Sequence, residues 1–540
     1  MAFGWKLHGD GRTIAPGAVV APDERLSWGR TFGLGAQHVV AMFGATFVFP
    51  IIMGLNPQLA IMMSGVATLL FLLIVQGKVP SYLGTSAAFV GGVAAVTAQG
   101  ATPPQVTGAI FVCGLALAGV GVFIHFLGAA ALTKILPPVV TGAVVMLIGF
   151  NLAPVVANIY WPQDQWVALT VMVLVILLSV GLRGFLGRIS IFLGLIFGFL
   201  LSVVLDLVFG PITAYNSASG EVDTHLRVNW DGVLAADWFG FPPATDVAAG
   251  VVGWHLPEIN MTFVVLMIPA IIALIAENVG HVKAVQEMTG TDLDPYIGRA
   301  VAGDGIATSV ATFVGGSPTT TYAENIGVMA STRVYSTATY YVAAGVAIFF
   351  GLSPKFGALV AATPGGVLAG ITVVLYGMIG LLGAKIWREN RVDFANPLNM
   401  VPVAAGIIIA IGDVQLRFSD SFVLSGIAFG TIVTIVMYHV ARAVAPGSMR
   451  LDDGVDPASG TTITVGSKGL HNLEELGLRQ NWGLYGHRVL GRTMEGHLIV
   501  EEQPDQDGNR NGDEGLGTAR GVRLRDGHAQ VSTENGEERS

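Results

Sequence analysis

Residues 315–333 read GGSPTTTYAENIGVMASTR, and this stretch shapes the organisation of the whole chain. It lies within an apolar region, yet Gly315, Gly316 and Pro318 open it, and threonines and the carboxylate of Glu324 follow. Proline removes a backbone donor and glycine weakens a helix, so one continuous helix is disfavoured here. We therefore expect an interrupted membrane segment, with its apolar span at about 317–331.

A second stretch of the same kind lies much earlier in the chain. Residues 80–97 combine a proline, three glycines and small hydroxyl side chains within an apolar block, namely Pro80, Gly84, Thr85, Ser86, Gly91 and Gly92. The same physical reasons disfavour a continuous helix. The chain thus contains two interrupted segments.

Composition predicts an all-α polytopic membrane protein. Hydrophobic residues make up 52% of the chain, charged residues only 12%, and the mean hydropathy is +0.64. Apolar blocks of about 20 residues can each cross a bilayer as a helix, and the alternation typical of a membrane β-barrel is absent. The sequence predicts fourteen spans, at about 31–54, 57–76, 80–97, 104–127, 133–157, 165–182, 187–209, 259–286, 296–314, 317–331, 336–354, 360–384, 395–412 and 420–443.

The spans divide into two halves. A long connection, 210–258, separates a first repeat (31–209) from a second repeat (259–444), each with seven spans. Because seven is odd, the second repeat enters the membrane inverted relative to the first, and the interrupted segments are the third of each. Matching interruptions in two inverted repeats point to the substrate site of a transporter near the bilayer midplane.

Charge in the loops predicts the orientation. Within the membrane body only Arg227, Lys355 and Arg417 fall outside when the N-terminus is placed inside. The positive-inside rule then predicts that both termini lie in the cytoplasm. We expect the protein in the inner (cytoplasmic) membrane. The connection 210–258 is external.

The flanking segments are polar. Residues 1–30 form a cytoplasmic N-terminal segment without an apolar run long enough for a signal peptide. Residues 445–540 are rich in Gly, Asp, Glu, Asn and Arg, and we expect a mostly disordered cytoplasmic tail. The net charge of −9 comes largely from this tail. No basic stripe with interleaved aromatic residues indicates a nucleic-acid partner, and the single cysteine, Cys113, cannot form an intrachain disulfide.

Few ionisable residues lie within the spans, and they gather around the second interrupted segment. Glu277 and His281 are four residues apart, so they share one helix face. Asp304 lies in the next span between glycines, and Glu324 lies in the interrupted segment itself. A carboxylate in hydrocarbon costs several kcal/mol, so each should face a cavity or a partner.

Structural roles are the alternatives for these residues. His281 could cap a helix at the cytoplasmic interface, and Glu277 could join helices by hydrogen bonds. Asp304 could serve packing as well as function. Gln37 and His38, near the start of the first span, fit structural hydrogen bonding better than ligand binding.

A site of this composition suits a neutral, planar, amide-like solute. Carboxylates accept hydrogen bonds from ring N–H groups, while backbone N–H groups at an interrupted helix donate to carbonyls. An organic anion would need lysine or arginine at mid-depth, and the spans contain neither there. Protons are the obvious coupling ion. These residues narrow the class of solute without naming it.

The run Glu324–Arg333 carries a resemblance to a known family. It matches the signature of the nucleobase–ascorbate transporter (nucleobase:cation symporter-2) family: Gln or Glu, Asn-x-Gly with Asn325 and Gly327, four residues, then Thr332 and Arg333. Glutamate in the first place resembles the bacterial uracil permeases. Further runs at Gln37–His38, Lys78–Ser86 and Ala276–His281 are similar, and the resemblance covers about 30–445.

The resemblance implies seven-plus-seven inverted repeats, with a core domain of spans 1–4 and 8–11, a gate domain of spans 5–7 and 12–14, and short extended pieces in spans 3 and 10. It also implies alternating access, proton symport of uracil and a homodimer, without cofactor or metal. The residues implied to bind substrate are Glu277, Glu324, Tyr322 and the backbone amides of Ala87 and Ala323. His281 and Asp304, with Glu277, are implied in proton coupling.

One departure leaves the substrate open. Uracil permeases commonly have phenylalanine at the place of Ala87, so the pocket could be larger and take thymine, xanthine or urate. A xanthine or urate symporter is therefore the alternative function. A membrane enzyme using Glu277, His281 and Glu324 as acid–base groups is disfavoured, because no metal-ligand cluster or activated nucleophile accompanies them.

Overall fold

The computed structural model describes residues 4–15, 18–128, 136–216, 221–246, 250–419 and 422–446, and five strands beyond residue 486. The chain divides into two units, Met1–Arg450 and Leu451–Ser540. In the second unit the strands form one antiparallel sheet. They are β9 (His487–Arg492), β10 (Leu498–Glu502), β11 (Arg520–Arg525), β12 (His528–Ser532) and β13 (Glu538–Arg539). Apart from these strands, Ala445 and Pro446, the tail expected to be mostly disordered lies outside the described residues.

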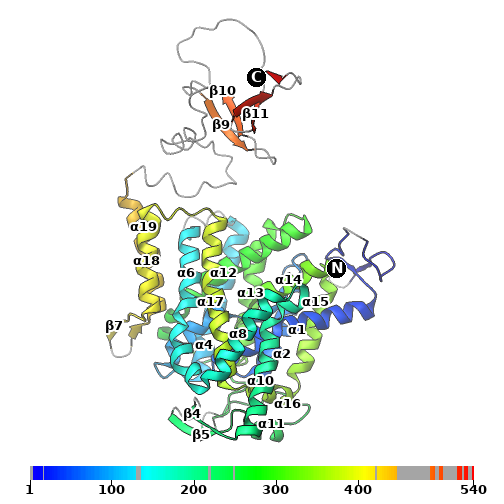
Figure 1. The fold of residues 1–540 in the computed structure, drawn as a ribbon, viewed down its shortest axis with the longest axis vertical. Helices are drawn as coiled ribbons and strands as arrows, with labels where there is room; N and C mark the ends of the chain where they lie inside the picture. The colour runs from blue at the N-terminus through cyan, green and yellow to red at the C-terminus, as the bar shows by residue number, and fades with distance from the viewer. Residues whose placement is uncertain are drawn as a thin grey trace. The chain divides into compact units, whose positions relative to one another are not determined.

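The first unit is a bundle of helices that follow the apolar blocks (Figure 1). Its first part contains α1 (Trp28–Ile52), α2 (Pro57–Ile74), α3 (Val90–Thr97), α4 (Pro103–Leu127), α6 (Pro138–Asn151), α8 (Gln165–Gly181), α9 (Gly184–Arg188) and α10 (Ser190–Phe209). Its second part contains α12 (Met261–Thr289), α13 (Ile297–Phe313), α14 (Ala323–Thr332), α15 (Thr337–Gly351), α16 (Pro354–Ala361), α17 (Gly365–Glu389), α18 (Pro397–Ile411) and α19 (Gly426–Val444).

Eight of the described helices are long and apolar enough to cross a membrane, and α15 with α16 makes a ninth candidate bent by 83°. The sequence did not predict α16. This helix forms because Pro354 occupies its first position and Ser353 caps the N–H of Phe356. After α6 the chain remains helical but irregular. It passes through α7 (Ala153–Val155), a π-helical turn (Val156–Tyr160) and a 3₁₀ turn (Trp161–Gln163).

The helices pack in two groups. In one group α4 packs on α13, α2 packs on both α13 and α15, and α1 and α12 join them. In the other group α6 and α8 pack on α17, while α18 and α19 pack on each other and on α6 (Figure 1). Contacts between the two groups are fewer than contacts within them.

Glycines allow the closest helix pair to form. A Cβ atom at Gly114 on α4 would lie 2.5 Å from Ser309 Oγ and 2.9 Å from the Gly305 carbonyl oxygen on α13. A Cβ atom at Gly305 would in turn lie 2.3 Å from the backbone nitrogen of Ala118. Within a bilayer, helix association relies on such close packing by small residues, because lipid is as apolar as a side chain.

The connection 210–258 contains folded elements and is held by ion pairs. It contains a hairpin of β4 (Ile212–Asn216) and β5 (Glu221–His225), and a short helix, α11 (Asp231–Ala235). Arg227 binds Asp164 Oδ2 through Nε at 2.8 Å and Asp206 Oδ1 through Nη1 at 3.1 Å. These carboxylates belong to the N-terminus of α8 and to α10, so the guanidinium ties the hairpin to both helices.

We predict that Gly114→Val destabilises the protein, because two methyl groups must enter the contact between α4 and α13. Overpacking of this kind costs roughly 1–3 kcal/mol. Gly119→Val is the matched control, since Gly119 lies on the same helix and a Cβ atom there would meet no described atom within 4 Å. Thermal unfolding of the detergent-purified variants provides the measurement, and equal melting temperatures would contradict the packing argument.

Candidate functional site

Two short strands from the interrupted segments pair at the centre of the site. Strand β3 (Leu83–Thr85) is antiparallel to β6 (Thr319–Thr321), with Gly84 opposite Thr320. The ladder extends on both sides, because the Ser86 N–H donates to the Pro318 carbonyl at 2.8 Å and the Tyr322 N–H donates to the Tyr82 carbonyl at 3.0 Å. The two segments thus satisfy each other's backbone groups, which a bilayer interior requires.

Each strand leads directly into a helix. A 3₁₀ turn (Ala87–Phe89) and α3 follow β3, and α14 follows β6. The first N–H groups of a helix have no partner within the helix and lie at the positive end of its dipole. Ala87 is half-buried and Ala323 is exposed.

Helix α12 brings two of the predicted residues to the strand pair. Thr320 Oγ1 lies 3.5 Å from Glu277 Oε2, and His281 Nδ1 lies 2.7 Å from Thr321 Oγ1. The spacing of four residues therefore places both side chains beside β6. Glu324 is the second residue of α14, and α14 packs on α12.

Asp304 lies on α13, which packs on β6. Its side chain is fully buried, and Oδ2 accepts a hydrogen bond from Asn278 Nδ2 at 2.6 Å. Asn278 Oδ1 in turn lies 3.5 Å from Thr321 Oγ1, which also contacts His281. Polar groups therefore connect His281 to Asp304 through Thr321 and Asn278.

The hydroxyl group of Tyr322 is used within the protein. It donates to the Thr85 carbonyl at 2.8 Å and lies 3.1 Å from Thr46 Oγ1 on α1. The ring covers Gly84 so closely that a Cβ atom there would lie 2.5 Å from the ring carbon Cζ. Tyr322 thus holds the two strands together.

The remaining signature residues lie along α14. Asn325 Nδ2 donates to the His38 carbonyl at 2.9 Å, and the His38 ring packs on Tyr340 with centroids 4.5 Å apart. Gln37 is half-buried next to His38, and Gly327 is half-buried in the middle of α14. Thr332 and Arg333 lie at the far end of α14, away from the strand pair.

Sequence reasoning missed a group of polar residues that hold the site together. Thr308 Oγ1 donates to the Thr319 carbonyl at 2.9 Å and accepts the Thr319 N–H at 3.1 Å, which closes the free edge of β6. Asn278, Thr320 and Thr321 were visible next to predicted residues but received no role. Their signal was the clustering of small polar side chains in otherwise apolar segments.

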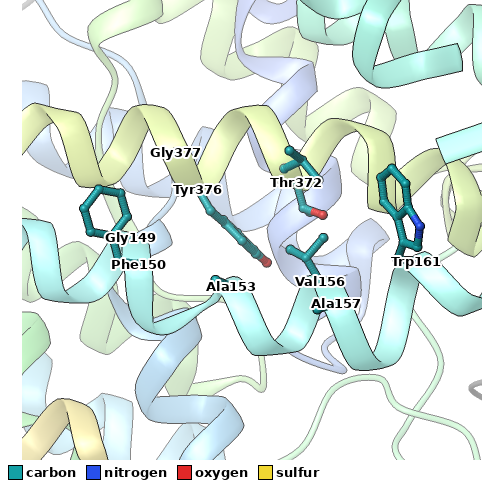
Figure 2. A pocket seen from close by; sticks show the side chains of 10 residues that line it. Gly149, Phe150, Ala153, Val156, Ala157, Trp161, Thr372, Tyr376 and Gly377 are labelled. Atoms are coloured by element: carbon teal, nitrogen blue, oxygen red, sulfur yellow. The ribbon is translucent and has the colours of Figure 1, made fainter. Parts of the chain in front are cut away.

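Two cavities lie in the other helix group or at its border. The first, about 480 Å³, lies between α6 and α17, and Tyr376, Thr372 and Trp161 line it together with small residues (Figure 2). The second, about 790 Å³, separates the ends of α1 and α3 from the turns after α6 and the start of α17. Neither is lined by Glu277 or Glu324. The second cavity also reaches residues of the hairpin β4–β5, among them Ile212 and His225.

Comparison with known proteins adds independent evidence. The model of the Permease family matches residues 29–419. The pyrimidine permease RutG of Escherichia coli (strain K12) is 43% identical over 440 residues, which is 80% of this chain and 93% of that protein. The uracil permease of Bacillus caldolyticus is 34% identical over 77% of this chain and 92% of its own length. The uracil permease of Bacillus subtilis (strain 168) is 32% identical over 74% and 90%.

A solved structure shares the fold. The murine Slc26a9 anion transporter in the inward-facing state aligns with a TM-score of 0.55 at 12% identity, covering 78% of this chain and 69% of that one. At this identity the likeness concerns the fold alone. Because the family model spans most of the membrane unit and the relatives align over nearly their whole lengths, this chain belongs to the permease family of xanthine and uracil permeases, multi-pass membrane transporters.

Proposed function

We propose that this protein imports uracil, or a closely related pyrimidine, across the cytoplasmic membrane by proton symport. One observation carries the proposal: Glu277 of α12 lies 3.5 Å from Thr320 of the strand pair, and Glu324 lies in the first turn of α14, the helix that follows β6 and packs on α12. Relatives that are 32–43% identical are named as uracil or pyrimidine permeases, which favours the same substrate class.

Complementary hydrogen bonding supports uracil as the substrate. Its two ring N–H groups match carboxylates, which only accept, and Glu277 and Glu324 supply these. Its two carbonyl groups match backbone donors at Ala87 and Ala323. Charge-assisted hydrogen bonds in a water-poor site are stronger than neutral ones, and an unpaired partner is costly. A solute lacking either kind of group would leave part of the site unpaired.

The buried polar network supports proton coupling. Three carboxyl groups repel one another when all are ionised in a low-dielectric site, so a proton held among them eases substrate binding. The contacts from His281 through Thr321 and Asn278 to Asp304 offer a route for rearranging that proton. Proton entry and substrate binding are thereby linked in one site.

The arrangement of helices supports alternating access. We assign the group of α1–α4 and α12–α15 as a core domain that carries the substrate, and the group of α6–α10 and α17–α19 as a gate domain. Together they make fourteen segments in two inverted repeats of seven, with a homodimer as the assembly and both termini in the cytoplasm. The cavity between the outer ends of α3 and α17 gives the core room to move against the gate.

A purine such as xanthine or urate is the second candidate, and Ala87 favours it. Ala87 is half-buried, and its methyl group is much smaller than a phenylalanine ring at the same place would be. The backbone donor is unaffected by this difference, so uracil still binds. The size of the accepted base therefore distinguishes the two candidates.

We expect Glu324→Gln and Glu277→Gln each to weaken uracil binding by roughly 10- to 100-fold, because a carboxylate acceptor becomes an amide that presents N–H groups to N–H groups. Glu287→Gln is the matched control, since Glu287 is exposed on the same helix as Glu277. Uptake of labelled uracil and binding to purified protein provide the measurements. Unchanged binding in both site variants, with normal membrane insertion, would refute the assignment.

Proton coupling predicts that an inward proton gradient drives accumulation. In proteoliposomes, adding uracil should acidify the lumen, and a protonophore should abolish accumulation. His281→Gln should retain exchange of uracil across the membrane while losing proton-driven accumulation, because binding groups remain but the titratable ring is gone. Accumulation that requires sodium and survives the protonophore would contradict the mechanism.

Substrate size gives a test of the role of Ala87. We expect Ala87→Phe to reduce competition by xanthine and urate while uracil and its backbone contact are retained. Competition of labelled uracil uptake by unlabelled bases measures this directly. If the unchanged protein prefers xanthine over uracil, the purine candidate replaces the pyrimidine one.

A further inference from the structure

The N-terminal segment is folded against the far end of α14, although the proposed mechanism does not use it. Val20 N donates to the Arg333 carbonyl at 2.9 Å, and Tyr335 N donates to the Val20 carbonyl at 2.8 Å. Val20 and Val334 form a parallel bridge. Val20 thus pairs with the backbone between α14 and α15, which lies more than three hundred positions further along the chain. Figure 1 shows the N-terminal end of the chain beside these two helices.

Side chains reinforce this backbone pairing. Val20, Leu26 and Val334 form a separate buried apolar cluster. Trp5 Nε1 donates to Thr337 Oγ1 at 2.8 Å, and Thr337 Oγ1 donates to the Pro22 carbonyl at 2.9 Å. Ser336, which caps α15, donates its hydroxyl to the Glu24 carbonyl. These contacts cover the whole connection between the two helices.

The N-terminal segment also has hydrogen bonds and strand pairing of its own. Strand β1 (Lys6–Leu7) pairs in parallel with β2 (Glu24–Arg25), and His8 Nδ1 lies 2.7 Å from Glu24 Oε2. Asp10 accepts backbone hydrogen bonds from Thr13 and Arg12, which lower the pKa of its carboxyl group to about 2. The polar composition that suggested a simple cytoplasmic extension therefore builds a compact cap.

The connection that this cap holds is strained. Arg333 has a φ of 57°, in the left-handed region, which is unfavourable for a residue with a side chain. Such a conformation persists when its surroundings over-determine it. Pairing of Val20 with Arg333 and Tyr335 supplies that constraint on the side of the cap.

Helix α14 links the cap to the substrate site. It begins at Ala323 and Glu324, directly after β6, and ends at Thr332, next to Arg333. Ten helical residues span only about 15 Å, so one short helix connects Arg333 to Glu324.

We propose that the N-terminal segment, residues 4–27, is a positioning element for the substrate site. By pinning Arg333 and Val334 it sets the axial position of α14, and so the placement of Glu324 and the Ala323 N–H relative to Glu277. The part of this inference that concerns the bound base rests on the proposed function; the part that concerns α14 does not.

Val20→Ala tests the proposal with Val19→Ala as its matched control, because Val20 is buried in the cluster and the adjacent Val19 is 37% exposed. Two quantities are measured on the full-length purified protein: hydrogen exchange of the amides in 323–332 and the dissociation constant for uracil. Loss of the buried methyl groups should speed exchange in α14 about tenfold. Uracil binding should weaken several-fold, and Val20→Ile should retain both properties of the unchanged protein.

The outcomes are distinguishable. The proposal is overturned if Val20→Ala frees only the amides of residues 4–27 and leaves α14 exchange and uracil binding at the level of Val19→Ala. It is also overturned if exchange rises equally in all helices, since that indicates general destabilisation. If the unchanged protein does not bind uracil, the proposed function fails, and α14 exchange still decides whether the cap positions the helix.

Discussion

Mutual pairing of two short strands inside the membrane unit underlies the whole arrangement of the site. Neither β3 nor β6 can satisfy its own backbone groups, and hydrocarbon offers no water to replace them. Each strand supplies the partner groups of the other, with Thr308 closing an edge. Pairing occupies the strand groups but not the first turns of the helices that follow, and because the strands are antiparallel these two helix starts follow opposite ends of the pair.

The acidic residues of the site lie close to the paired strands. Glu277, Asp304 and Glu324 are tolerated because polar groups surround the strands, and their grouping in turn gives the site its acceptor character. Tyr322 contributes differently from its neighbours: its hydroxyl group bonds to Thr85 and Thr46, and its ring packs on Gly84. The geometry of the site therefore depends on residues from α1, α12 and α13 as much as on the interrupted segments themselves.

Packing density differs between parts of the bundle. Glycines bring α4 and α13 into backbone contact within one helix group, while a cavity lies between the two groups on the side of the hairpin β4–β5. Closely packed interiors resist small displacements of their side chains. The cap formed by the N-terminal segment adds to the packed part, since it contacts the connection between α14 and α15.

Local patterns in the sequence were enough to predict the membrane class, the approximate positions of most helices and both interruptions, because hydropathy, proline and glycine act over short distances along the chain. They also placed Glu277 and His281 on one helix face and located the start of the signature run at Glu324. The position of α16 and the fold of the polar N-terminal segment escaped prediction. Tertiary packing was needed to establish which strands pair and in which register, that Asp304 connects to the strands through Asn278, and that Val20 holds Arg333. Such contacts join residues up to several hundred positions apart, and they arise from the simultaneous packing of helices that only the complete bundle brings together.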